Sequence, residues 1–323
     1  MIVKLFKSNS PTGFILLPLV VIGLRIMPFF RSIEPDTEPA MPFYEMLRNI
    51  FGIFPHFAEV FAILLLTIEA IYLNRIIIDT ALYQKHSWLP ALFFVVLMSA
   101  QPHLLLLHPI HPAGLFIMIA MSKITGLHKN EGTRSALFDS GLLIGVASLF
   151  YYPSLVLFFW VVASYFTFRT FNWKEFLVIW IGGGIPYLFL FVYFFWTDQI
   201  VKFFPFPFNF HFDTSLISHS HSVYLVWIGL LLVLMLVSVA RLYGNTAIFN
   251  VRQRKTAISF IWFIAASFIV LFLHEPYHMA FAISAVVFSA LLAQLFLSMQ
   301  GWVAETLFAA IAGMIIYLHY FYA

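Results

Sequence analysis

A run of carboxylates is the feature of the sequence that best fits a reaction centre. It lies in the segment SIEPDTEP, directly after the first apolar stretch, and contains Glu34, Asp36 and Glu38. Pro35 and Pro39 disfavour helical backbone at the residues before them, so we expect an extended segment near the membrane surface. Asp36 is the first candidate for a catalytic general base, and the other two carboxylates are its alternatives. The competing interpretation is a solvated loop without chemistry, because a run of charges usually forms a solvated surface.

Two arginines precede this acidic segment. Arg25 lies inside the first apolar stretch, and Arg31 lies at its end. Guanidinium groups bind phosphate through parallel N–H groups, so both arginines are candidate substrate-binding residues. A charged side chain inside an apolar stretch indicates either a function or a buried partner. Arg25 can also extend its head to the outer lipid headgroups, because the end of the stretch is only a few residues away.

Histidines form a second set of chemically competent residues. HPIHP, HSH and HEPYH each contain a pair, and three imidazoles with a carboxylate can hold zinc or non-haem iron. His274 and His278 have the spacing of a helical ligand pair. However, Pro276 favours the first position of a helix, which places His274 before that helix and His278 inside it. We therefore predict no metal site and keep His274 and His278 as candidate substrate-binding residues.

Carboxylates within the apolar stretches raise the question of a proton relay. Glu59 and Glu69 are ten residues apart, which is about 15 Å along a helix axis. Asp139 lies at the start of another apolar stretch. A relay needs further polar groups between such residues, and few ionisable groups occur at that depth. We therefore favour separate structural pairings for these three residues.

Composition identifies the solvent of this chain as lipid. Of the 323 residues, 62% are hydrophobic and 10% are charged, whereas an average soluble domain has about 25% charged residues. The chain has no cysteine, which excludes disulfides, thiolate metal sites and cysteine nucleophiles. The net charge is +3, with basic residues scattered in short clusters, so nucleic acid is not an expected partner. The lipid bilayer is the expected environment.

Apolar runs predict an all-α, polytopic transmembrane bundle of about eleven spans. We assign the whole chain, 1–323, to a single integral membrane domain and interpret the first run as a retained helix. The runs near 112–123 and 136–151 are shorter than the ~20 residues that a crossing needs. The predicted spans lie near 13–30, 55–74, 87–107, 112–123, 136–151, 153–168, 174–197, 222–240, 256–273, 277–299 and 302–322.

Basic residues predict the orientation of the bundle. A cytoplasmic N-terminus and a periplasmic C-terminus place thirteen of the seventeen lysines and arginines inside, as the positive-inside rule requires. These are Lys4, Lys7, Arg75, Lys85, Lys123, Lys129, Arg134, Arg169, Lys174, Arg241, Arg252, Arg254 and Lys255. The acidic segment and most histidines then lie on the outer side. We therefore predict a multi-pass protein of the bacterial inner membrane whose working surface faces the periplasm.

The two longest outer connections are expected at 31–54 and 198–221. The first contains AMPFYEMLRNIFGIF, an amphipathic segment that we expect to lie along the membrane surface. The second contains FFPFPFNFHFD, in which two prolines favour an extended strip. Within the seventh span, IGGGIPY has no lysine and follows no strand, so it is not a phosphate-binding loop. Its small residues favour close helix packing instead.

One stretch of the sequence resembles a known family. Residues 135–189 contain the pattern LFD-G-IG-ASLFY, followed by R-FNW-E and a G-PY helix. This pattern resembles an uncharacterised multi-pass inner-membrane family of Gram-negative bacteria. The resemblance implies a fold of the same kind and carries no activity.

A second resemblance concerns architecture. A cytoplasmic start, one span, an acidic outer loop and a surface-lying helix are similar to GT-C-type glycosyltransferases that use polyprenyl-phosphate-linked sugars. Those enzymes carry a catalytic Asp or Glu in the first outer loop, where Asp36, Glu34 and Glu38 stand here. This chain differs from them in being short and in having no periplasmic domain. HEPYH also looks similar to the paired histidines of membrane carotene-cleaving oxygenases.

The sequence leaves open whether the protein is an enzyme, and it identifies no cofactor. The first hypothesis is a transferase that acts on a polyprenyl-phosphate-linked sugar, with Arg25 or Arg31 near the phosphate. The second is a non-catalytic accessory subunit that packs against other inner-membrane proteins in an envelope-assembly or export complex. The third is a histidine-metal or carotenoid-cleaving enzyme. A cavity, a protein partner or stoichiometric bound metal would distinguish the three.

Overall fold

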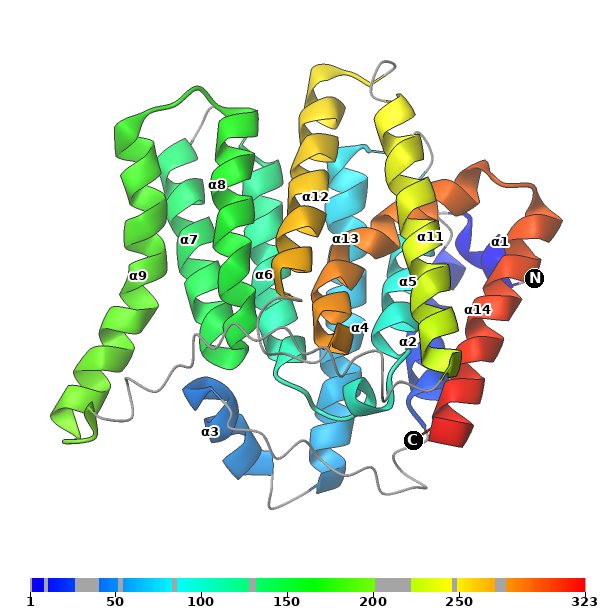
Figure 1. Cartoon of the computed structure of the whole chain (residues 1–323), viewed down its shortest axis with the longest axis horizontal. Coiled ribbons are helices and arrows are strands. Elements are labelled where there is room, and N and C mark those ends of the chain that lie inside the picture. Colours follow the sequence, from blue (N-terminus) through cyan, green and yellow to red (C-terminus); the bar gives the residue numbers. More distant parts are fainter. Residues whose placement is uncertain are drawn as a thin grey trace.

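The computed structural model describes residues 2–8, 11–26, 41–51, 55–82, 86–127, 132–200, 222–245, 249–270 and 277–322. Every regular element in these ranges is a helix, as the apolar runs predict (Figure 1). The N-terminal half contains α1 (Ile2–Phe6), α2 (Pro11–Leu24), α3 (Pro42–Phe51), α4 (Pro55–Thr80), α5 (Leu89–Met98), η2 (Pro102–Leu105), α6 (Ile110–Thr125) and α7 (Thr133–Phe150). The remainder contains η3 (Tyr152–Val156), α8 (Leu157–Phe168), α9 (Trp173–Trp196), α11 (Ser222–Asn245), α12 (Val251–Ile269), α13 (Tyr277–Ser298) and α14 (Gly301–Tyr322).

Each predicted apolar run overlaps one of these helices. Among the described residues, three helical stretches are long and apolar enough to cross a membrane: His56–Thr80, Trp173–Trp196 and Phe281–Ser298. Shorter apolar helices of 10–17 residues make up much of the remaining bundle. By length and composition these helices are compatible with a membrane protein, whose outward-facing apolar side chains have lipid as their solvent.

The run at 87–107 differs from its prediction, because it does not form one continuous helix. Helix α5 is ten residues long and ends at Met98, and a 3₁₀ turn follows at Pro102–Leu105. Every residue of α5 is buried, so its apolar side chains pack against protein on all sides. The connection after α5 is only partly enclosed, because Leu104 and Leu105 are buried whereas His103 is exposed.

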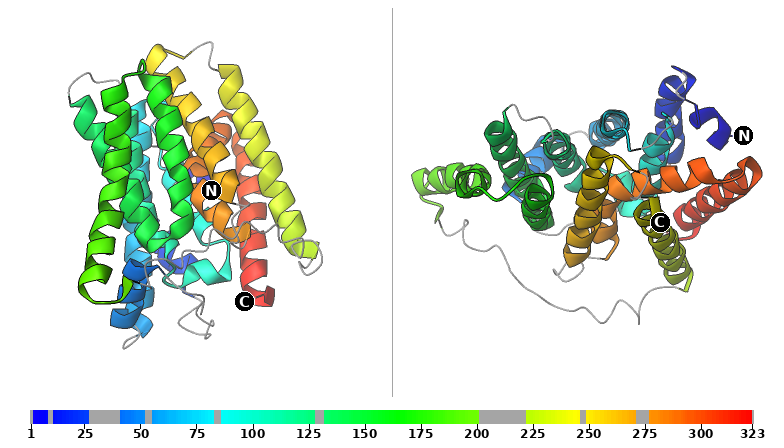
Figure 2. Two further views of the ribbon diagram at one scale, coloured as in Figure 1. Left: turned by 60° about the vertical axis from the view of Figure 1, so that its left-hand side comes forward. Right: turned by 90° about the horizontal axis from the view of Figure 1, so that it is seen from above.

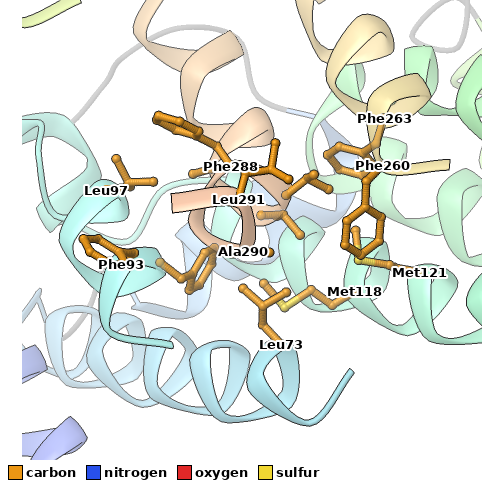
Figure 3. Close-up of a cluster of buried hydrophobic side chains, with 14 of the residues drawn as sticks. Leu73, Phe93, Leu97, Met118, Met121, Phe260, Phe263, Phe288, Ala290 and Leu291 are labelled. Atoms are coloured by element: carbon orange, nitrogen blue, oxygen red, sulfur yellow. The ribbon is translucent and has the colours of Figure 1, made fainter. Parts of the chain in front are cut away.

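The core lies where α4, α5, α6, α12 and α13 meet. Figure 3 shows large apolar side chains from all five helices in one cluster. Their close packing supplies the dispersion contacts that hold helices together when the surrounding lipid is equally apolar. The labelled residues are Leu73, Phe93, Leu97, Met118, Met121, Phe260, Phe263, Phe288, Ala290 and Leu291.

Glycines set the contact between α7 and α9. A Cβ placed on Gly145 would lie 2.7 Å from the carbonyl oxygen of Gly183. A Cβ on Gly182 would likewise collide with the carbonyl oxygen of Phe138. The backbones therefore approach more closely than any larger residue allows, which confirms the predicted packing role of the IGGGIPY segment. The far face of α9 is exposed at the edge of the bundle (Figure 2).

Basic side chains join neighbouring segments at one end of the bundle. Lys7 Nζ donates to the carbonyl oxygens of Phe296 and Met299, and Lys255 Nζ donates to that of Phe168. Lys123 Nζ lies 2.8 Å from Asp139 Oδ2, which gives Asp139 the structural pairing that the sequence favours. The start of α9 and the start of α12 both lie at the end of the bundle opposite α3 (Figure 1). Related contacts there join Arg169 with Thr133, Arg241 with Ser298, and Arg252 with the Asp79 carbonyl.

Candidate functional site

Arg25 is the centre of a buried polar cluster. It follows the last residue of α2, and its side chain is only 1% exposed. Nη2 donates to the carbonyl oxygen of Met98 at 3.3 Å, and Nη1 donates to that of Leu105 at 3.5 Å. The last carbonyls of a helix lack partners within it and attract cations, and Met98 ends α5. The guanidinium group of Arg25 therefore binds the C-terminal end of α5. It is buried in protein and does not extend to the lipid headgroups.

Glu69 supplies the opposite charge from α4. It is 0% exposed and interacts electrostatically with Arg25, but the two side chains form no ion pair within 4.0 Å. The backbone N–H of Leu115 faces the carboxyl group, yet neither carboxyl oxygen has a hydrogen-bond partner of normal geometry. Gly114 leaves room for this group, since a Cβ there would lie 2.7 Å from Glu69 Oε1. The site therefore holds a buried carboxyl that protein groups do not satisfy.

His111 connects Arg25 to the α5–α6 connection. Its Nε2 lies 3.3 Å from Arg25 Nη2 and 3.0 Å from the carbonyl oxygen of Leu104. A single ring nitrogen cannot donate to Leu104 and accept from Arg25 at once, so the tautomer selects one of the two bonds. His111 Nδ1 has no hydrogen-bond partner. His108 stands beside this group and accepts a hydrogen bond from the backbone N–H of Ile110.

Helix α3 forms within the segment that the sequence predicts to be amphipathic, and it lies at the same end of the bundle as the C-terminal end of α2 (Figure 1). None of its residues is buried, and its acidic and basic side chains stay on the surface. Tyr44 donates its hydroxyl to the carbonyl oxygen of Leu107 at 2.5 Å, and Phe43 packs edge-on against Phe150 of α7. Arg25 and Tyr44 thus both bind carbonyls of the short stretch 105–107. Arg25 precedes the acidic segment in the chain and Tyr44 follows it, so the described residues on both sides of the segment bind the same stretch of backbone.

Most residues proposed from the sequence fall outside the described ranges. Glu34, Asp36, Glu38, Arg31 and His274 lie there, and so does most of the outer connection 198–221. His278 belongs to α13, in a part of that helix where the side chains are not described. Among the proposed site residues, Arg25 has a described side chain, and it contacts Met98, Leu105 and His111. The structure therefore locates the flanks of the acidic segment.

The remaining candidates are dispersed. Glu59 pairs with His56 at 3.3 Å, near the N-terminal end of α4. Within the described residues, no group of three or more His, Asp or Glu side chains is arranged to hold a metal ion. Sequence reasoning missed that the backbone carbonyls of Met98 and Leu105 bind Arg25. The signal for it was the clustering of Pro102 and Pro109 around a run otherwise suited to a helix.

Comparisons with protein-family models, with curated proteins and with solved structures gave no match to this chain.

Proposed function

We propose that the protein is a multi-pass component of the bacterial inner membrane, crossing it about eleven times. The N-terminus lies in the cytoplasm and the C-terminus in the periplasm. Support comes from the gathering of basic side chains at the end opposite α3, since basic residues favour the cytoplasmic side. On this orientation α3 lies at the periplasmic surface, with its exposed Met46 and Ile50 turned toward the lipid interface.

The activity that we propose is transfer of a sugar from a polyprenyl-phosphate donor, as in GT-C-type glycosyltransferases. One observation carries the proposal: both flanks of the acidic segment are fixed to the carbonyls of 105–107, beside α3. The sequence predicts that the carboxylates of this segment lie near the membrane surface, where a lipid-linked donor presents its phosphate. The donor also suits a compartment that holds no nucleotide sugars.

The proposed reaction uses the acidic segment as its base. Asp36 accepts the proton of an acceptor hydroxyl while that oxygen forms a bond to the anomeric carbon of the sugar. The bond between that carbon and the phosphate oxygen breaks, and polyprenyl phosphate leaves with the electron pair. Arg31 stabilises the phosphate. Arg25, which precedes the acidic segment in the chain, is held in place by its bond to the Met98 carbonyl. His278, near the start of α13, and His274, which precedes that helix in the sequence, bind the sugar.

Purified protein in lipid nanodiscs tests the proposal. The protein is incubated with polyprenyl-phosphate-linked sugars and with hydroxyl-bearing glycan and protein acceptors, and mass spectrometry measures the release of polyprenyl phosphate. Asp36→Asn should lower the rate by about 10²- to 10⁴-fold, the usual contribution of a general base. Glu45→Gln is the matched control, because Glu45 is an exposed carboxylate of α3 at the same end. Equal rates for the two variants, or no release by the unaltered protein, would refute the transferase.

A further inference from the structure

We propose that Glu69, with Arg25 and a bridging water molecule, forms a proton-binding site inside the bundle. The inference concerns residues outside the acidic segment, so it does not rest on the transferase. Its ligand is a proton, carried on the carboxyl group of Glu69. The water molecule joins that carboxyl group to the guanidinium group of Arg25.

Buried polar atoms that lack a hydrogen-bond partner define the site. Glu69 Oε1 and Oε2, Arg25 Nε and His111 Nδ1 are all buried and have no hydrogen-bond partner of normal geometry among the described residues, although the backbone N–H of Leu115 faces the Glu69 carboxyl. Buried polar atoms left in this way usually bind an ordered water molecule, which makes about three hydrogen bonds. A water molecule can accept a hydrogen bond from Arg25 Nε and donate one to Glu69. The unpartnered atoms of Arg25 and Glu69 are therefore the groups that such a water molecule would join.

The same site suits both forms of the carboxyl group. An ionised carboxyl only accepts hydrogen bonds, whereas the protonated group also donates one. A water molecule reorients to donate to the first form and to accept from the second. A direct ion pair between Arg25 and Glu69 would fit the ionised form alone. Arg25 and Glu69 make no such contact within 4.0 Å, so no direct ion pair holds the carboxyl group in its ionised form.

Other carboxylates of the chain show what a purely structural pairing looks like. Asp139 lies 2.8 Å from Lys123 Nζ, and Glu59 lies 3.3 Å from His56 Nδ1. Both pairs are in direct contact and partly exposed. Glu69 differs in being buried near the middle of α4, in one of the three long apolar helices. An ionisable residue in that position is costly and points to a role beyond packing.

Few titratable groups surround Glu69. From the end of α2 comes Arg25, and from α6 comes His111, which contacts Arg25. His108 lies next to His111 and interacts with it electrostatically. Helix α5 contributes only apolar side chains, and the described side chains of α13 carry no charge. Any pH-dependent change at this site therefore involves Glu69 and the two histidines, with Arg25 as the fixed charge.

Infrared difference spectroscopy tests the inference. The protein in nanodiscs is compared between acidic and alkaline buffer, where we expect a carboxylic-acid C=O band that shifts in D₂O. Glu69→Gln should remove this band, and Glu59→Gln, on the same helix, should retain it. A band that persists in Glu69→Gln, or its absence from the unaltered protein, would overturn the proposal.

A second measurement needs no variant and so does not depend on folding of Glu69→Gln. Dicyclohexylcarbodiimide is apolar and reacts with protonated carboxyl groups within membranes. Peptide mass spectrometry should find its adduct on Glu69 of the unaltered protein, with a labelling rate that falls as the pH rises. A rate independent of pH, or no adduct on Glu69, would contradict proton binding there. Neither measurement uses sugar transfer, so failure here and failure of the transferase are distinguishable.

Discussion

Replacing Gly182 by alanine should destabilise the bundle through the α7–α9 contact. The added Cβ collides with the carbonyl oxygen of Phe138 and lies 3.1 Å from the backbone N of Leu142. These are backbone atoms of α7, so no side-chain rotation relieves the contact and the two helices must separate. Gly184, two residues later, has no atom within 4 Å of its would-be Cβ and faces outward. The two variants add the same methyl group to the same helix in opposite environments.

Their comparison isolates the steric cost. Alanine is favoured over glycine in a helix by about 1 kcal/mol, and this gain is common to both variants. Overpacking a close contact costs about 1–3 kcal/mol and applies to Gly182 alone. Gly182→Ala should therefore be less stable than Gly184→Ala by about 1–3 kcal/mol. Each kcal/mol lowers the melting temperature of a domain of 150–250 residues by about 2–4 °C, and somewhat less in a larger protein.

Thermal unfolding followed by tryptophan fluorescence in a single detergent measures this difference. We expect Gly184→Ala to melt at or above the temperature of the unaltered protein and Gly182→Ala to melt below it. Equal melting temperatures for the two variants would refute the close approach of α7 and α9. Gly141→Ala, on the facing helix, should reproduce the loss because its Cβ meets the carbonyl oxygen of Ile179.

Two further predictions concern orientation and a polar contact between helices. The chain has no cysteine, so single-cysteine variants report accessibility directly. In intact spheroplasts a membrane-impermeant maleimide should label Gln199→Cys and leave Lys174→Cys unlabelled; the reverse pattern would invert the proposed topology. Ser259→Ala should cost about 1 kcal/mol in unfolding experiments, because its hydroxyl bonds Trp160 Nε1 at 3.2 Å and Ser164 Oγ at 2.7 Å across the α8–α12 contact. Ser267→Ala, whose hydroxyl bonds only its own helix at Ile264, should cost close to nothing, and equal losses would contradict the interhelical role.

The sequence by itself determined the class of the fold and the position of nearly every helix. Apolar runs predict helices in lipid because backbone groups there must be satisfied within their own segment, and that is a local property. The surface helix α3 follows from an equally local pattern, the alternation of apolar and charged residues over about three turns. The packing role of Gly182 and Gly183 was also predictable, since small residues in a span favour close contact.

Tertiary structure alone decided where α5 ends and what Arg25 binds. An apolar run has the same composition whether it faces lipid or protein, so hydropathy cannot distinguish a full span from the buried helix of ten residues that forms here. The partners of Arg25 are carbonyls of Met98 and Leu105, which lie more than seventy residues away in the chain. Backbone carbonyls are present at every residue, so composition does not show which of them are free to bind a side chain. Pro102 and Pro109 mark an interruption of the helix in the sequence, but only the tertiary structure shows that Arg25 reaches the carbonyls there.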